Sequence, residues 1–164
     1  MRPPGSLDPL FRYFEGEKHA GALALALGLV AVAGAVWLWR DAGPYKAMLY
    51  PLALVGVIEL GVGVGLLVRT GPQVAALTAE LERTPEAAVA KERARIVRVN
   101  ERFELIKAAE LLLIAVAAAL IVFAGRPAIA GVGLGLLLQA SALLVFDVFA
   151  EQRAHVYAAW LGTS

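Results

Sequence analysis

The chain has 164 residues, of which 60% are hydrophobic, and its mean hydropathy is +0.71. This composition is too apolar for an ordinary water-soluble domain of this length and indicates a protein that is solvated by lipid. The formal net charge is only +1, which argues against nucleic acid as a partner. Because the chain has no cysteine, disulfides, thiol nucleophiles and cysteine metal sites are excluded.

Four apolar runs follow one another along the chain, at about residues 20–39, 47–68, 105–124 and 128–146. Each has roughly the 20 residues that a helix needs to cross about 30 Å of hydrocarbon. None shows the alternation of polar and apolar residues that is typical of a membrane-spanning β-strand. The sequence therefore predicts an all-α membrane protein, a single-domain four-transmembrane-helix bundle over residues 1–164 whose partner is the lipid bilayer.

The charged segment at about residues 72–104 is predicted to be a helical connector. Gly71 and Pro72 are expected to break the chain after the second span. A helix-start signal, Thr-Pro-Glu, follows at residues 84–86, and no breaker comes before Gly125. One helix of about 40 residues is therefore expected to run from water into the membrane.

An apolar stripe on this connector helix includes Ile96, Val99 and Phe103. It predicts that the part in water packs on the preceding helix or on a second subunit, while the charges around it form a solvated face with local ion pairs. Asp8 followed by Pro9 predicts that the first helix also begins outside the membrane. The bundle is thus expected to have helical extensions on one side.

Lysine and arginine are distributed unevenly between the two sides. Eleven precede the first span, lie in the connector or follow the fourth span, against Arg40, Lys46 and Arg126 on the other side. Because cytoplasmic segments carry the excess, both termini and the connector are predicted to be cytoplasmic. Aromatic belts are expected at the outer interface (Trp37, Trp39, Tyr45, Tyr50) and at the inner interface (Phe11, Tyr13, Phe14, Tyr157, Trp160).

Charged side chains inside the spans cost free energy in lipid, so each needs a partner or a purpose. Glu59 in the second span and Glu110 in the third are predicted to lie at similar depth. Two such acids facing each other would share a proton unless a cation lay between them. Lys107 is three residues from both Glu104 and Glu110, so it could neutralise either acid and remove the need for a metal.

More acids and two histidines occur towards the cytoplasmic side of the bundle. Carboxylates and imidazoles from several helices are the ligands of dinuclear metal sites in four-helix bundles, although the Glu-x-x-His motif of those sites is absent here. Such ligands suit a divalent metal, with zinc as the first expectation and iron or manganese as alternatives. The candidate ligands are Glu59, Glu110, Asp147, Glu151, His155, His19, Glu15 and Glu104.

Three functions remain open from these residues. A metal with an open coordination position could activate water, which predicts a metal-dependent membrane hydrolase. Buried acids are also typical of a proton- or cation-coupled small transporter. The third alternative is a structural protein that binds another membrane component. Close packing through small residues is expected for two glycine groups (Gly61, Gly63, Gly65; Gly131, Gly133, Gly135), and such faces make a homodimer possible.

Two stretches of the chain resemble a group of small bacterial four-span proteins that have no assigned activity. They are LLVRTGPQVAALTAELERTPEAAVAKERARIVRVNERFELIKAAE and LLLQASALLVFDVFAEQRAHVY. The resemblance implies the bacterial inner membrane as the location. It also implies that one site contains Lys107, Glu110, Asp147, Glu151 and Arg153, but it implies no catalytic activity.

Overall fold

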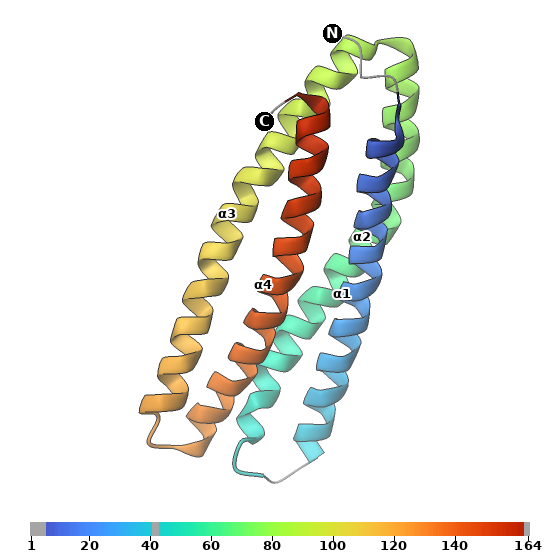
Figure 1. Cartoon of the computed structure of the whole chain (residues 1–164). Coiled ribbons are helices and arrows are strands. Elements are labelled where there is room, and N and C mark those ends of the chain that lie inside the picture. Colours follow the sequence, from blue (N-terminus) through green and yellow to red (C-terminus); the bar gives the residue numbers. More distant parts are fainter. Residues whose placement is uncertain (1–5, 41–42, 163–164) are drawn as a thin grey trace.

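The computed structural model describes residues 6–40 and 43–162, and these form four long helices. They are α1 (Asp8–Arg40), α2 (Leu49–Arg83), α3 (Pro85–Phe123) and α4 (Pro127–Leu161), with a short 3-10 helix, η1 (Lys46–Met48), before α2. The helices run alternately up and down (Figure 1). Each is long and apolar enough to cross a membrane. The predicted all-α four-helix membrane bundle is confirmed.

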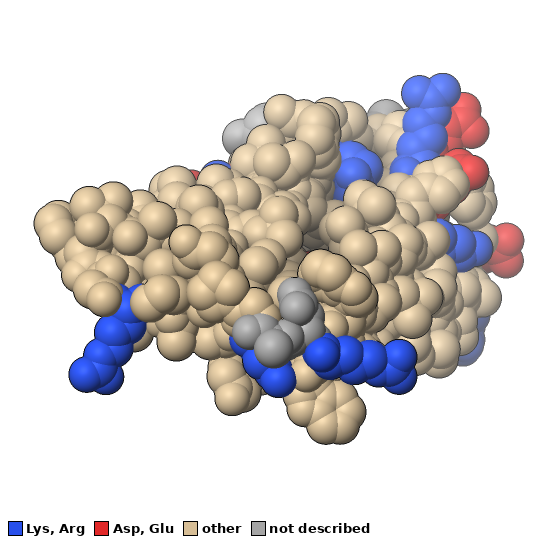
Figure 2. Space-filling model, turned by 90° about the horizontal axis from the view of Figure 1, so that it is seen from below, with Lys and Arg blue, Asp and Glu red and all other residues tan. Residues whose placement is uncertain are grey.

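The helices are longer than a bilayer requires. α3 has 39 residues, which corresponds to about 58 Å against about 30 Å of hydrocarbon. The excess lies at the end where the described chain begins and ends (Figure 1). We call this end, made by residues 6–19, 69–104 and 147–162, the charged end. The opposite loop end carries the α1–η1 and α3–α4 connections, and its surface is mostly uncharged (Figure 2).

The predicted helix starts are confirmed. α1 begins at Asp8, whose backbone N–H donates a hydrogen bond of 3.1 Å to the Ser6 hydroxyl. α3 begins at Pro85. The hydroxyl of Thr84 makes no cap to α3, because it turns back and donates to the carbonyl of Glu80 at 3.5 Å. Thr84 alone therefore separates α2 from α3.

The predicted chain break at Gly71 and Pro72 is wrong, because α2 continues through both residues to Arg83. Proline removes one backbone donor from the helix. Two residues before the proline, the Thr70 hydroxyl donates to the carbonyl of Leu66 at 2.5 Å. Leu77, beyond the proline, is buried in a core shared with the other helices. Tertiary packing on both sides of Pro72 therefore holds the helix together.

The four helices meet in a hydrophobic core at the charged end. The predicted stripe of α3 lies there: Ile96 is fully buried, and Val99 and Phe103 pack against the cluster. Tyr13 and Tyr157 stack in the same core, with 4.5 Å between ring centres, so they do not belong to the predicted interfacial belt. The buried members are Leu10, Tyr13, Phe14, Leu77, Val89, Ile96, Ala154, Tyr157, Ala158 and Leu161.

Within the membrane segment, α1 packs mainly on α2 and α3 on α4. Gly21 and Gly28 of α1 face Gly63 and Gly56 of α2, and each pair of glycines is spaced by seven residues. A Cβ on Gly28 would lie 2.7 Å from the carbonyl oxygen of Gly56, and one on Gly63 would lie 2.7 Å from that of Gly21. The two backbones therefore touch, which only glycine permits.

Glycines of α4 form the other close contacts. A Cβ on Gly131 would meet the backbone of Tyr45 at 2.8 Å, and one on Gly133 would meet the carbonyl oxygen of Ala117 at 2.9 Å. The predicted small-residue packing is thus confirmed for α4 and for Gly63. Gly61 and Gly65 make no such contact, because no atom of the described chain lies within 4 Å of the position that a Cβ on either residue would take.

Gly63→Ala and Gly61→Ala form a matched pair two residues apart on α2. We expect Gly63→Ala to destabilise the bundle by about 1–3 kcal/mol, because its methyl group would overlap backbone atoms of α1. Gly61→Ala has open space and should leave stability unchanged or higher. Unfolding in mixed micelles with increasing dodecyl sulfate measures both, and equal midpoints for the two variants would contradict the packing described.

Candidate functional site

The structure brings together two of the predicted site residues inside the bundle, Glu110 of α3 and Asp147 of α4. Their carboxyl groups lie close enough to each other for a side-chain hydrogen bond. Glu110 is only 5% exposed, and its Oε2 has no hydrogen-bond partner within the described chain. An ionised carboxylate can only accept hydrogen bonds, so two carboxyls this close need a proton or another cation between them.

An ion pair lies one turn closer to the charged end. The ammonium of Lys107 donates to both oxygens of Glu151, at 2.7 and 2.6 Å. These hydrogen bonds hold the pKa of Glu151 below its usual value. Lys107 does neutralise an acid, as the sequence allowed, but the acid is Glu151 of α4 rather than Glu104 or Glu110 on its own helix.

The pair and the ion pair form a continuous row that reaches the surface. Asp147 and Glu151 are one turn apart and interact electrostatically. His155 Nε2 lies 3.6 Å from Glu151, and its side chain is 61% exposed. We call Glu110, Asp147, Glu151 and His155 the acid row. Towards the loop end, residues 111–125 and 127–146 contain no titratable side chain, so on α3 and α4 the row continues only towards the charged end.

The other predicted residues lie apart from the acid row. Glu59 of α2 is 3% exposed and both of its oxygens lack a hydrogen-bond partner in the described chain, but it does not pair with Glu110. Glu15, His19 and Glu104 are exposed. Among residues 6–40 and 43–162, no group of three or more acids or histidines could hold a metal ion. The divalent-metal site remains a prediction.

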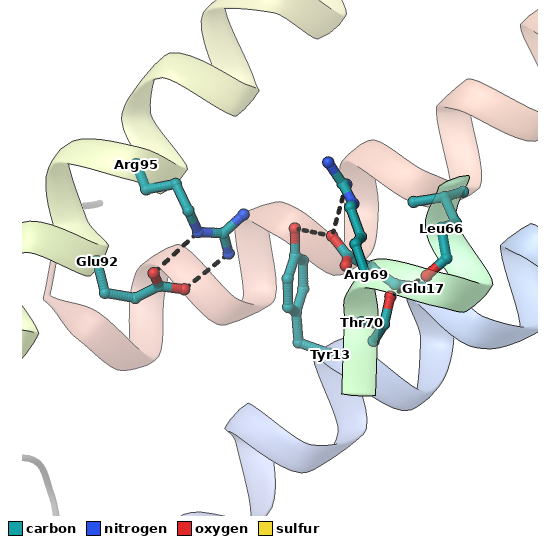
Figure 3. A network of polar contacts seen from close by, with 7 residues as sticks. All are labelled: Tyr13, Glu17, Leu66, Arg69, Thr70, Glu92 and Arg95. Atoms are coloured by element: carbon teal, nitrogen blue, oxygen red, sulfur yellow. Dashed lines mark hydrogen bonds and ion pairs between the residues drawn. The ribbon is translucent and has the colours of Figure 1, made fainter. Parts of the chain in front are cut away.

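A second polar cluster, at the charged end, was not predicted from the sequence. Glu92 of α3 is 6% exposed and accepts two hydrogen bonds from Arg95, at 2.8 and 2.7 Å (Figure 3). The Tyr157 hydroxyl donates a third at 3.1 Å. The guanidinium of Arg95 also lies 5.6 Å from the ring centres of Tyr13 and Phe14. All polar atoms of Glu92 are thereby satisfied within the core.

The cluster continues onto α1 and α2. The Tyr13 hydroxyl donates to Glu17 at 3.0 Å, and Glu17 lies 3.9 Å from Arg69 (Figure 3). Burial, together with the negative charge of Glu17, raises the pKa of Tyr13. Burial and Glu92 do the same for the pKa of Tyr157. Side chains from all four helices are therefore linked around the charged-end core.

The sequence carried a signal for this cluster. Glu92 and Arg95 lie at positions i and i+3, on the helix face that also carries Ile96 and Val99. Charges on an apolar stripe indicate a buried ion pair rather than a solvated face. The expectation of a solvated face does hold for Lys91, which is exposed and bonds Glu80 of α2 at 2.8 Å.

Arg95→Met tests the buried ion pair. The variant leaves the carboxylate of Glu92 buried without its main partner, so we expect a loss of roughly 3 kcal/mol in unfolding free energy. Arg98→Met removes an exposed charge one turn away and should cost much less. The double variant Glu92→Leu/Arg95→Met should be more stable than Arg95→Met alone. A single variant as stable as the Arg98 control would contradict the assignment.

Tyr13 and Tyr157 make the stability of the charged end depend on pH in the alkaline range. In the unfolded chain, phenols ionise near pH 10, whereas Tyr13 and Tyr157 have raised pKa values in the fold. Their contribution to the free energy of unfolding is fully present below about pH 10 and is lost as the pH rises above it. The reason is that these phenols lose their protons at a lower pH in the unfolded chain than in the folded protein. We expect the unfolding midpoint to fall less steeply above this pH in the double variant Tyr13→Phe/Tyr157→Phe. Parallel slopes would exclude this coupling.

Comparison of the chain with known protein families, with curated proteins and with solved structures finds no match. The resemblance to small bacterial four-span proteins therefore stays a prediction.

Proposed function

We propose that the protein is a proton-coupled membrane protein in which the Glu110–Asp147 pair binds the coupling proton. The observation that carries the proposal is the proximity of two carboxyl groups on neighbouring helices, one of them almost fully buried. With one proton the pair is held together by a hydrogen bond. Without it, two negative charges face each other in a medium of low dielectric constant and repel. Protonation is therefore coupled to how closely α3 and α4 approach.

The proton reaches the pair from the charged end, along the acid row. His155 is exposed and forms the outer end of the row. Glu151 links it to Asp147. The excess of Lys and Arg at this end supports the cytoplasmic side for it, and the predicted resemblance to bacterial proteins supports the bacterial inner membrane. The protein thus samples cytoplasmic protons.

The row favours a coupling site over a channel. A conduit needs titratable groups or water-lined polar groups on both sides of its central acid. Residues 111–125 and 127–146 offer only Gln139 and Ser141 among apolar side chains. A proton bound by the pair therefore returns to the side from which it came unless the helices rearrange.

A divalent metal is the alternative occupant of the same pair, as predicted from the sequence. It is less favoured because Glu151, the nearest third ligand, already gives both oxygens to Lys107. Zinc, iron or manganese would have to displace that ammonium. A metal-dependent hydrolase would in addition need an open coordination position on the bound ion.

Spin labels test the proton coupling, and the cysteine-free chain allows them to be placed without other changes. Leu112→Cys on α3 and Val145→Cys on α4 replace exposed side chains. We expect the distance between the two labels to increase by several ångström as the pH rises and the shared proton leaves. Glu110→Gln removes one charge of the pair and should abolish the change.

Glu104→Gln is the matched control, because Glu104 is exposed on α3 and outside the acid row. A label distance independent of pH in the otherwise unaltered chain would refute the coupling, as would loss of the response in Glu104→Gln. Metal analysis of the purified protein, with Glu110→Ala and Asp147→Ala alongside, tests the alternative. Near-stoichiometric zinc, iron or manganese that both variants lose would replace the proton as the shared cation.

A further inference from the structure

A groove with a volume of about 660 Å³ lies at the charged end between the start of α1 and the end of α4. Its size is within the range of small-molecule sites. The walls are largely apolar, with Phe149, Val156 and the two core tyrosines, and two arginines, Arg12 and Arg153, line it from opposite helices. The groove is separate from the acid row, although both use α4.

The two arginines have no ion-pair partner among the described residues. The acids that form ion pairs, Glu17, Glu80, Glu92 and Glu151, bind other cations. Among the described residues that line the groove, Asp8 is the only acid, and it lies one helical turn further from the membrane than Arg12. The membrane-side part of the groove therefore presents two positive charges and no negative one.

Arg153 is positioned by the backbone of α1. A Cβ on Gly16 would lie 2.6 Å from Cδ and 2.8 Å from Nε of Arg153, so the side chain rests in the notch that this glycine leaves. The resting place directs the guanidinium towards α1, where Arg12 also lies. The distance between the positive charges of Arg12 and Arg153 thus depends on Gly16, which carries no charge itself.

The groove reaches from the headgroup layer to just beyond it. Phe149 comes three residues after the predicted fourth span, about 4.5 Å beyond the hydrocarbon, which is inside a headgroup layer roughly 5–8 Å thick on each side. The backbones of Arg153 and Arg12 lie about 10.5 and 12 Å beyond the hydrocarbon, so their long side chains extend back towards the membrane to reach a headgroup. Phe149 is 59% exposed and Val156 is 69% exposed. Apolar side chains exposed beside unpaired arginines fit an amphiphile better than they fit water.

We infer that this groove binds an anionic phospholipid. The phosphodiester lies between Arg12 and Arg153, which donate charge-assisted hydrogen bonds to its oxygens. One acyl chain passes Phe149 into the hydrocarbon. The site would retain a lipid from the cytoplasmic leaflet at the junction of the α1–α2 and α3–α4 pairs.

Native mass spectrometry of the detergent-solubilised full chain, titrated with phosphatidylglycerol, tests this inference. Arg12→Gln/Arg153→Gln should weaken lipid binding roughly tenfold or more, since a charge-assisted contact contributes at least that much. Arg98→Gln/Arg102→Gln makes the same change of charge at exposed sites on α3 and should bind as the unaltered chain does. Equal weakening by both double variants would overturn the site.

Gly16→Leu provides a second variant that keeps every charge. Its side chain fills the notch and displaces Arg153, so it should weaken phosphatidylglycerol binding as well. Binding unchanged in Gly16→Leu would mean that general electrostatic attraction, not a built site, holds the lipid, and would refute the inference.

Two further titrations distinguish a phospholipid headgroup from a soluble phosphate ion as the ligand of the groove. Phosphatidylcholine should bind more weakly than phosphatidylglycerol, and inorganic phosphate should not compete at concentrations similar to those of the lipid. Effective competition by inorganic phosphate would assign the groove to a soluble anion and overturn the lipid assignment. Circular dichroism of each variant, matched to the unaltered chain, ensures that a loss of binding is not a loss of fold.

Discussion

Contact between the backbones of α1 and α2 is the constraint on which the rest of the structure depends. Lipid tails are as apolar as leucine, so helices inside a bilayer gain little by hiding apolar side chains from it. They gain from dispersion where their surfaces approach closely, and the facing glycines of α1 and α2 allow the two backbones to touch. Once this pair is fixed, Met48 and Pro51 are in place to receive Gly135 of α4.

Outside the hydrocarbon the hydrophobic effect acts again, and the packing changes accordingly. Large side chains such as Phe14, Ile96 and Tyr157 fill the charged-end core, where glycine contacts are replaced by stacked rings and buried aliphatic groups. Both forms of packing occur along the same four helices. The apolar segment of α3 is only 11% buried, against 28% in each of the other helices, so much of that segment faces lipid.

Two buried acids of the bundle, Glu92 and Glu110, have physically different neighbours. Glu92 has a permanent counter-charge in Arg95, with geometry that satisfies both oxygens, so its state is fixed. Glu110 has another acid beside it, and in the proposed function an exchangeable proton neutralises this pair. The first arrangement is typical of a structural role, and the second is the one on which the proposed function rests.

Much of the fold could be predicted from the sequence, because apolar length, proline-initiated helix starts and the stripe around Ile96 are local signals. The break expected at Pro72 failed since packing of Leu77 with the other helices outweighs one lost hydrogen bond. Candidate site residues could be found as charges within apolar runs, but their partners could not. Pairing of Glu110 with Asp147, and of Lys107 with Glu151, depends on the rotation of α3 against α4, which sequence spacing on a single helix does not determine.

The single residue Thr84 between α2 and α3 has a consequence for how the chain enters a membrane. That junction and the helical extensions of the described chain lie at the charged end. With this end on the predicted cytoplasmic side, the described residues contain no polar domain that has to be translocated through the hydrocarbon. Only the short α1–η1 and α3–α4 connections cross, with Arg40, Lys46 and Arg126 as the basic residues near them. Each helical hairpin can therefore insert as one unit from the side on which it is synthesised, leaving association of the two hairpins as a later step.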